Sequence, residues 1–407
     1  MRKPELLAPA GNLDILKTAV MYGADAVYIG GEMYGLRANA KNFDRPRMEE
    51  GISFAHEHGA KVYVTANIIA HNRDIDGIEA YLKELAEIKP DAILVADPGI
   101  FMMAKELCPN VDLHISTQAN NVNYKTYEVW KAQGATRVVT GRELSIAEIS
   151  EIHDKTKGSI EIESFIHGAM CISYSGRCLL SAYMTGREAN LGACTHPCRW
   201  KYALMEETRP GEFFPVFENE RGTFIMNSKD LCMIEHIPEL VAAGVDSFKI
   251  EGRMKPALYV AVISSVYREA IDDFFKDPFL YESKKEKYRH DISMCSHRPF
   301  GTGFYFGKPG TEGQLYDEST YDRDAVYLGT VENADNDRGV IYQKNKFFAG
   351  EEIELMRPFT DVKKVKVLEI RDDDGNLMES CPHPLQKLNV KFSEPVENWD
   401  IIRRPAE

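Results

Sequence analysis

The sequence lacks long hydrophobic runs. None of its 407 residues belongs to an apolar stretch approaching the length of about eighteen residues that a membrane-spanning helix requires. The first residues also lack the apolar core of a secretory signal peptide and lead directly into a strand-like pattern. We therefore expect a cytoplasmic protein that does not enter a membrane.

Positive charge is scarce. Lys and Arg total 49 against 63 Asp and Glu, which gives a formal net charge of −14 at pH 7. Broad, non-specific binding of nucleic acid normally goes with a basic domain, so this composition argues against it. Residues 171–201 are locally basic, because this segment contains one acidic residue, Glu188, and four basic ones: Arg177, Arg187, Arg199 and Lys201. An RNA contact through Arg199 and Lys201 and a solvated loop surface are both compatible with this pattern.

Two protease motifs and one nucleotide-binding motif are missing. His56 could begin a zinc-protease motif, but Ala60 stands where the second histidine is required. No Gly-x-Ser-x-Gly nucleophile elbow occurs. The glycines Gly30, Gly31 and Gly35 do not have the Gly-x-Gly-x-x-Gly spacing, and they are more simply explained by a turn at a strand end.

Cysteine is sparse overall but concentrated in one segment. Four of the eight cysteines fall within residues 171–198, separated by six, fifteen and three residues: Cys171, Cys178, Cys194 and Cys198. Four thiols this close indicate a single bound object, and disulfides are disfavoured in the cytoplasm. Zinc usually takes close Cys-x2-4-Cys pairs, so the irregular spacing favours an iron–sulfur cluster without excluding zinc. The remaining cysteines are isolated and are expected to be small buried hydrophobes: Cys108, Cys232, Cys295 and Cys381.

Short apolar runs alternate with helical patterns over the first two thirds of the chain. Eight runs have the length and composition of buried strands: 5–8, 26–30, 61–69, 92–96, 113–116, 137–140, 160–166 and 247–250. Helical patterns follow them: 13–21, 47–58, 76–88, 99–107, 124–133, 145–154, 231–243 and 256–275. A strand followed by a helix, eight times, predicts an α/β fold in which residues 1–280 form a (β/α)8 TIM-like barrel.

The cysteine-rich segment, residues 169–246, interrupts this pattern between the seventh and eighth strands. It therefore grows from the C-terminal end of a strand, which is the face where such barrels keep their active sites. Polar residues follow the ends of other strands: Asn67, Asp97, Gln118, Asn120, Arg142, Glu143, His167, Glu251 and Arg253. We expect these side chains to form a polar mouth around the bound cofactor.

The pattern changes beyond residue 280. Residues 281–294 are charged and poor in apolar side chains, which is typical of a linker or an exposed helix end. Only strand-like patterns and turns follow, so residues 295–407 are predicted to form a small all-β barrel domain.

Several motifs resemble those of the collagenase-like peptidases whose family names begin "peptidase U". They are Glu163-x-Phe-x-x-Gly-Ala-Met-Cys171 with Gly176-x-Cys-x-Leu-Ser181, Gly192-Ala-Cys-Thr-His-Pro-Cys-Arg-Trp200, Asn227-Ser-Lys-Asp230 and Lys249-Ile-Glu-Gly-Arg253. The resemblance covers essentially the whole chain and is closest to the branch that hydroxylates tRNA. It implies that Cys171, Cys178, Cys194 and Cys198 hold an iron–sulfur cluster of the [4Fe-4S] type.

The resemblance also implies an activity. Members of this branch are tRNA uridine hydroxylases that form 5-hydroxyuridine at the wobble position, with prephenate as co-substrate in place of molecular oxygen. The implied partners are tRNA and prephenate, and a paralogous subunit is a further candidate.

Three residues suit this chemistry. Arg37 and Arg253 each follow a strand end, and their guanidinium groups could hold the two carboxylates of prephenate. His167 could handle protons near the cluster. A surface salt bridge for Arg37 and a structural hydrogen bond for His167 are the alternatives.

Two other functions stay open. One is the peptidase of the family label, with Cys171 as nucleophile and His167 as base, although a cysteine committed to a cluster cannot attack a carbonyl group. The other is a related oxygen-independent hydroxylase that acts on ribosomal RNA or a quinone precursor.

Overall fold

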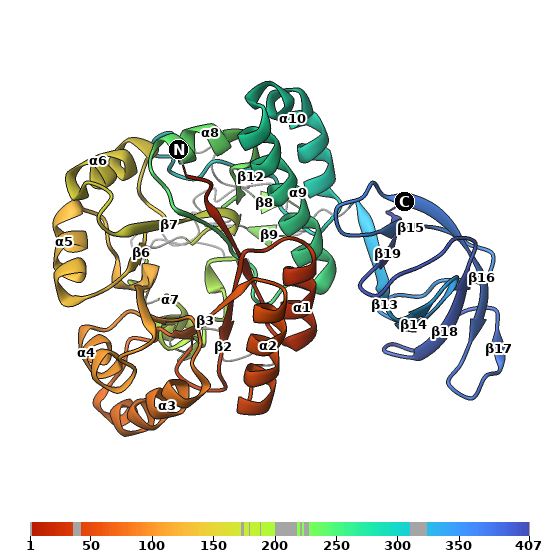
Figure 1. The fold of residues 1–407 in the computed structure, drawn as a ribbon, viewed down its shortest axis with the longest axis horizontal. Coiled ribbons are helices and arrows are strands. Elements are labelled where there is room, and N and C mark those ends of the chain that lie inside the picture. The colour runs from red at the N-terminus through yellow and green to blue at the C-terminus, as the bar shows by residue number, and fades with distance from the viewer. Residues whose placement is uncertain are drawn as a thin grey trace, which may run out of the picture.

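A computed structural model describes residues 2–35, 42–171, 175–178, 180–187, 189–199, 218–219, 222–223, 228–309 and 324–406. Figure 1 shows a ring of strands surrounded by helices and, beside it, a second domain made only of strands. No helix in these residues has the length and apolarity needed to cross a membrane.

Eight parallel strands form the closed barrel: β1 Glu5–Pro9, β2 Ala26–Gly30, β3 Lys61–Ala66, β4 Ala92–Val95, β5 Asp112–Ile115, β6 Arg137–Val139, β7 Glu161–Ala169 and β11 Ser247–Ile250. Closure occurs at β11, where Ser247 lies opposite both Glu5 of β1 and Glu163 of β7. The predicted TIM-like barrel is confirmed, with each strand within a few residues of its predicted position.

Helices cover the outside of the barrel: α1 Leu13–Met21, α2 Arg45–Glu57, α3 Ile75–Ile88, α4 Pro98–Leu107, α5 Tyr124–Gln133, α6 Ile146–Thr156, α8 Ile237–Ala242 and α9 Ala257–Lys276. Local sequence sets their ends. The Asn12 side chain accepts from the backbone N–H of Ile15, and Ser145 forms a capping box with Glu148. Gly134 ends α5 with a φ of +105°, a conformation that glycine adopts without strain.

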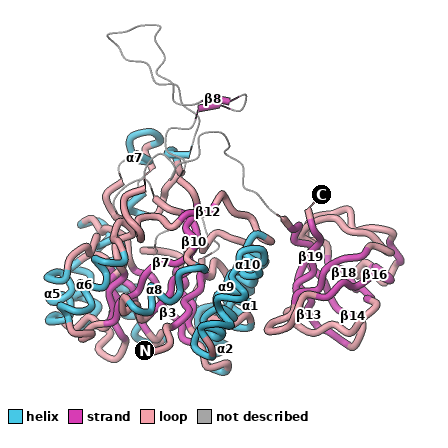
Figure 2. The backbone as a smooth tube through the Cα atoms, turned by 90° about the horizontal axis from the view of Figure 1, so that it is seen from above, coloured by secondary structure: helices cyan, strands magenta, loops and turns pink. Residues whose placement is uncertain are grey.

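The insertion between β7 and β11 lies over the mouth of the barrel. Its described elements are α7 Leu180–Thr185, the 3-10 turns Ala189–Leu191 and Pro197–Arg199, and the strands β8 Glu218–Asn219, β9 Gly222–Thr223 and β10 Asp230–Cys232. Figure 2 shows α7 at the end of the barrel opposite the N-terminus.

The predicted helix 231–243 is correct only in its second half. Its first residues form β10, which pairs antiparallel to the end of β7 with Cys232 opposite His167. β7 extends beyond its pairing with β6, which stops at Val139 opposite Glu163. The exposed backbone groups of β7 need partners, and β10 supplies them.

Of the two interpretations of residues 281–294, a linker or an exposed helix end, the helix is correct, because nearly all of these residues belong to α10 Pro278–Ser293. Its charged face points to solvent, while Tyr281, Tyr288 and Ile292 are buried. The Tyr288 hydroxyl donates to Asp273 of α9 at 2.6 Å. Three buried apolar side chains, together with ion pairs from Lys284 and Lys287 to α9, hold this helix, and the surrounding charges obscure the apolar pattern in the sequence.

The predicted start of the second domain at residue 295 is also wrong. Residues 295–309 pack on the barrel, where β12 Phe300–Gly301 pairs with β10. The Tyr305 hydroxyl donates to the carbonyl oxygen of Phe165 at 2.5 Å, and the Tyr305 carbonyl accepts from Ile146. The second domain therefore begins at β13.

That domain is the small β-barrel predicted from the sequence. Its strands are β13 Ala325–Asp335, β14 Arg338–Tyr342, β15 Glu352–Met356, β16 Lys363–Arg371, β17 Leu377–Met378, β18 Lys387–Phe392 and β19 Ile401–Pro405. It closes because β15 pairs with both β16 and β19. Its own apolar core includes Leu328, Val367 and Phe392.

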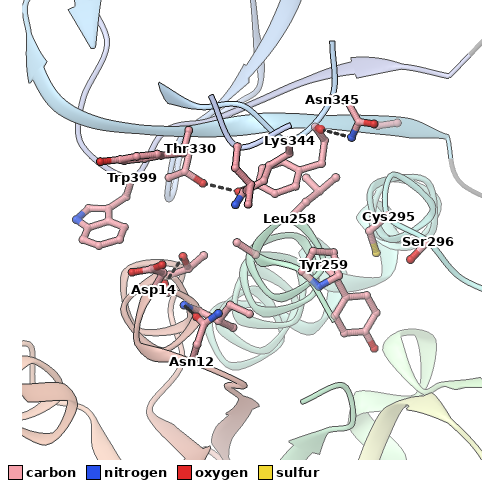
Figure 3. Close-up of a pocket in the computed structure, with 18 of the residues that line it drawn as sticks. Asn12, Asp14, Leu258, Tyr259, Cys295, Ser296, Thr330, Lys344, Asn345 and Trp399 are labelled. Atoms are coloured by element: carbon pink, nitrogen blue, oxygen red, sulfur yellow. Dashed lines mark hydrogen bonds between the residues drawn. The ribbon is translucent and has the colours of Figure 1, made fainter. Parts of the chain in front are cut away.

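The two domains touch at Tyr22, the residue that follows α1. The Tyr22 hydroxyl lies 2.9 Å from the carbonyl oxygens of both Met356 and Trp399. Beside this contact is a cavity of about 840 Å³, in which Asn12 and Asp14 of the barrel face Thr330 and Lys344 of the second domain (Figure 3). The second domain is thus docked directly on the barrel.

Candidate active site

A cavity of about 170 Å³ lies at the C-terminal end of the barrel strands. Side chains of β2, β3, β4, β7 and β11 and the turn after β5 form its floor, and the insertion forms its roof. Cys171, Cys178, Cys194 and Cys198 all line it. The thiols that are dispersed over 28 sequence positions therefore line one cavity.

Two glycines let the insertion approach the barrel this closely. Gly168, with a φ of +107°, ends β7 where an added Cβ would lie 2.6 Å from the carbonyl oxygen of Glu251. Gly176, with a φ of +71°, lies where an added Cβ would collide with the carbonyl oxygen of Gln118. Both positions need a residue without a side chain, because the backbone is left-handed and another backbone is in contact.

Hydrogen bonds hold the roof together. Ser181 of α7 accepts from the backbone N–H of Thr195 at 3.1 Å, which ties the helix to the segment carrying Cys194. Asn190 donates to the carbonyl oxygen of Cys178 at 3.1 Å. The backbone N–H of His196 donates to the Cys194 sulfur at 3.4 Å, a type of contact that tunes iron–sulfur clusters.

The donor set suits an iron–sulfur cluster, although the thiols are not arranged as a finished coordination site. In the part of the chain that the structure describes, no three Cys, His, Asp or Glu side chains are grouped closely enough to hold a metal ion. The four cysteines nevertheless share one cavity, and Cys171 is exposed while the others are half-buried. The cavity therefore matches a cluster in the type and number of its donors.

Cationic side chains dominate the charged lining. Arg142, Lys249 and Arg253 face the cavity together with a single carboxylate, Glu251, among its described lining residues. Arg142 forms an ion pair with Glu251 at 2.6 Å, and its guanidinium lies 4.0 Å from the centre of the Phe165 ring. The cavity thus presents several cationic N–H donors, which are suited to an anionic ligand.

Thr65 and Asn42 are among the groups that hold Arg253 in place. It is 4% exposed and donates to Thr65 at 3.0 Å and to Asn42 at 3.3 Å. An added Cβ at Gly30 would lie 2.6 Å from its Nη1 atom. Gly30 therefore leaves room for the guanidinium, a role that its sequence context did not indicate.

Lys249 is the cavity residue that the sequence prediction missed. It is 4% exposed, and its ammonium group lies 2.5 Å from a carboxylate oxygen of Glu163. A lysine in a strand of a fully covered parallel barrel needs a buried counter-charge, because both faces of such strands are out of water. The co-occurrence of Lys249 and Glu163 in two buried strands was the available signal.

Most of the expected polar mouth is present. Asn67, Gln118, Arg142, Glu251 and Arg253 line the cavity. The other expected members have structural partners instead: Asp97 caps α4, Asn120 donates to Glu143, and His167 lies elsewhere.

His167 faces away from the cysteines. Its ring packs among the side chains of α9 and Phe300, with the Tyr267 ring centre 5.7 Å away, and it is not among the cavity-lining residues. Burial, with contributions from Lys255 and His297, lowers its pKa to about 3. Cys232 lies beside the same tyrosine, and burial raises the pKa of its thiol to about 11.

Three predicted residues lie wholly or partly outside the described residues. These are Arg37, Lys201 and the side chain of Arg199. The isolated cysteines Cys108, Cys295 and Cys381 are buried, as expected for small hydrophobes.

Comparison with known proteins identifies the family. A model of peptidase family U32 matches residues 11–315, and a model of the C-terminal domain of that family matches residues 323–403. A solved C-terminal domain of a U32 peptidase from Geobacillus thermoleovorans matches 20% of this chain and 92% of its own, at 26% identity and a TM-score of 0.19.

Two curated relatives match most of the chain. The tRNA hydroxylation protein P1 of Bacillus subtilis is 45% identical over 409 residues, which cover 99% of this chain and 95% of the relative. The tRNA hydroxylation protein P of Escherichia coli is 38% identical over 399 residues, which cover 88% of this chain and 87% of the relative. The family models and these identities together assign the chain to peptidase family U32.

Proposed function

We propose that this protein is an iron–sulfur enzyme that hydroxylates the wobble uridine of tRNA to 5-hydroxyuridine, with prephenate as the oxygen-supplying co-substrate. The observation that carries the proposal is the meeting of four thiols and three cationic side chains in one cavity at the barrel mouth. The names of the relatives from B. subtilis and E. coli support the tRNA substrate and the reaction class.

Cys171, Cys178, Cys194 and Cys198 would hold a [4Fe-4S] cluster, which supplies a redox-active centre when bound. The protein's part is to bind both substrates beside this centre and to exclude water. Positioning of this kind can lower a reaction barrier by roughly 7–11 kcal/mol when the geometry is right.

Arginine side chains would bind prephenate. Arg253 lines the cavity, and its planar guanidinium can hold a carboxylate through two hydrogen bonds. Arg37 follows β2, the strand that ends at Gly30, and remains our second candidate for binding prephenate. His167 has no part in this proposal, because its buried ring is turned toward α9.

The family label suggests peptidase activity as the alternative. A Cys171–His167 nucleophile and base would need the two side chains in hydrogen-bond reach. Cys171 lines the cavity, while the ring of His167 packs on the other side of β7 against Tyr267 of α9. This pair is therefore not supported. A hydroxylase acting on ribosomal RNA or a quinone precursor would use the same cavity.

The proposal is tested with anaerobically purified protein. We expect about four irons and four sulfides per chain, and formation of 5-hydroxyuridine only when unmodified tRNA and prephenate are both supplied. Serine at any of the four cavity cysteines should remove most of the iron. Cys232→Ala is the matched control and should keep it, since Cys232 lies outside the cavity.

Stoichiometric zinc without acid-labile sulfide in the purified protein would contradict the proposal that the four cysteines hold an iron–sulfur cluster. Hydrolysis of a peptide substrate that needs no tRNA and is lost in Cys171→Ser would favour the peptidase.

A further inference from the structure

Charged side chains cross the interior of the barrel, where such folds normally stack branched apolar residues. Arg137 lies 2.6 Å from Glu5, 2.8 Å from Glu161 and 3.2 Å from Glu163. Glu163 in turn binds Lys249 at 2.5 Å. The side chains of Glu163, Arg137 and Lys249 are 0%, 4% and 5% exposed.

Stability is a poor explanation for this chain of ion pairs. Removing charges from water is costly, and well-packed apolar residues of the same volume often stabilise a core equally well or better. A buried network of this size therefore indicates that a charge is needed at one of its ends.

The two ends of the network differ. Arg137 and Glu161 border a hollow at the opposite, N-terminal end of the barrel, whereas Lys249 borders the cysteine-lined cavity. The network does not conduct protons along its length, since an arginine such as Arg137 keeps its proton in proteins. What it can do is hold the Glu163 side chain, and through it the Lys249 side chain, in place.

The ammonium has capacity for a ligand. Of its three N–H donors, one is used by Glu163, which is its single hydrogen-bond acceptor among the described residues. The group also lies 4.5 Å from the centre of the Tyr28 ring and 5.5 Å from that of Phe165. Two aromatic faces and one carboxylate keep the cation desolvated and leave the cavity as its open side.

We propose that Lys249 is the anion-binding group at the floor of the cavity, where its ammonium group binds a carboxylate of a small dicarboxylic acid. This inference rests on the proposed function, in which prephenate is that acid, and it adds a floor contact to the arginine contact at the rim. Glu163 and Arg137 are positioning residues that hold the ammonium without touching the ligand.

The test compares binding of prephenate and malonate to wild-type protein and to Lys249→Met by isothermal titration calorimetry. Methionine has a similar length and no charge. We expect the dissociation constant for either acid to rise about ten- to a hundredfold, the usual loss for one charge-assisted hydrogen bond. The absorbance of the cluster and the affinity for tRNA should not change. Lys61→Met, at the opposite end of the barrel, is the control and should bind both acids like the wild type.

Lys249→Met leaves Glu163 buried with one cation fewer, so the variant could fail to fold. The double variant Lys249→Met, Glu163→Gln removes both charges and keeps the volume. It should show the same loss of affinity with a melting temperature closer to that of the wild type. Glu163→Gln alone should weaken binding less, because the ammonium is still present but less firmly held.

Affinity within twofold of the wild type in a folded Lys249→Met protein would overturn the inference. If the wild type binds malonate but not prephenate, the proposed co-substrate is wrong, and the malonate affinities still decide the role of Lys249. If the wild type binds neither acid, both proposals fall.

Discussion

Burial sets the properties of His167 more strongly than its position near Cys171. Its pKa is lowered to about 3, while an unfolded chain has a histidine pKa of about 6.5. As the pH falls below about 6.5, the unfolded state binds a proton that the folded state does not. The free energy of unfolding therefore decreases with falling pH through this window, and no stability is gained above it.

His167→Leu should remove this pH dependence. We expect the mean slope of unfolding free energy against pH, measured by urea titration between about pH 7 and pH 5, to decrease by about 1 kcal/mol per pH unit. His290→Leu, on the solvent face of α10, is the control and should leave the slope as it is. Equal slopes in wild type and His167→Leu would contradict the buried environment of this ring.

Gly176 and Gly186 form a matched pair in the insertion. Their φ angles are +71° and +69°, so alanine costs about 1–2 kcal/mol of backbone strain at either site. A new Cβ at Gly176 would collide with Gln118, whereas among the described residues no atom lies within 4 Å of a Cβ at Gly186. Gly176→Ala should lose most of the bound iron and Gly186→Ala should retain it. Equal iron content in the two variants would show that the insertion does not need this close approach.

At the scale of elements, the sequence predicts the barrel well because each strand and helix carries its own signal. Alternating apolar runs, caps such as Asn12 and glycine ends such as Gly134 are local features. The strand β10 and the helix α10 depend on partners distant in sequence, and local patterns cannot identify these.

The site was predictable to the same degree. The four cysteines were expected to share one place because of their density, and they line one cavity. The orientation of His167 was not predictable, because period-two alternation from Glu163 and Phe165 would turn it inward. The register shifts between Lys249 and Ile250, which lie opposite Phe165 and His167, and such an irregularity rotates the following side chain.

The elements after α10 give a test of the domain boundary. A protein ending at residue 309 keeps β12 and the Tyr305 contacts, whereas one ending at residue 294 loses both. We expect the longer protein to unfold cooperatively and the shorter one to melt at a lower temperature or aggregate. Equal melting temperatures of the two shortened proteins, measured by circular dichroism, would show that residues 295–309 do not stabilise the barrel.

The whole molecule carries a formal charge of −14, which repels a polyanion such as tRNA. Binding must therefore depend on a local basic surface, and residues 171–201 are the candidate. Replacing Arg199 and Lys201 by alanine should weaken tRNA binding and lower the slope of log affinity against log salt by roughly one unit per lost phosphate contact.

The matched control for this pair is Lys363→Ala with Lys364→Ala on β16, where both side chains are exposed in the second domain. An unchanged salt slope in the Arg199 and Lys201 variant, with a reduced slope in the control, would move the RNA contact to the second domain.

The central claim is that this protein forms 5-hydroxyuridine in tRNA. The most direct measurement is mass spectrometry of tRNA nucleosides from a strain that lacks this protein and any close paralogue. The account predicts that 5-hydroxyuridine disappears, returns with the wild-type protein and does not return with Cys171→Ser. An unchanged level of 5-hydroxyuridine in that strain would contradict the account.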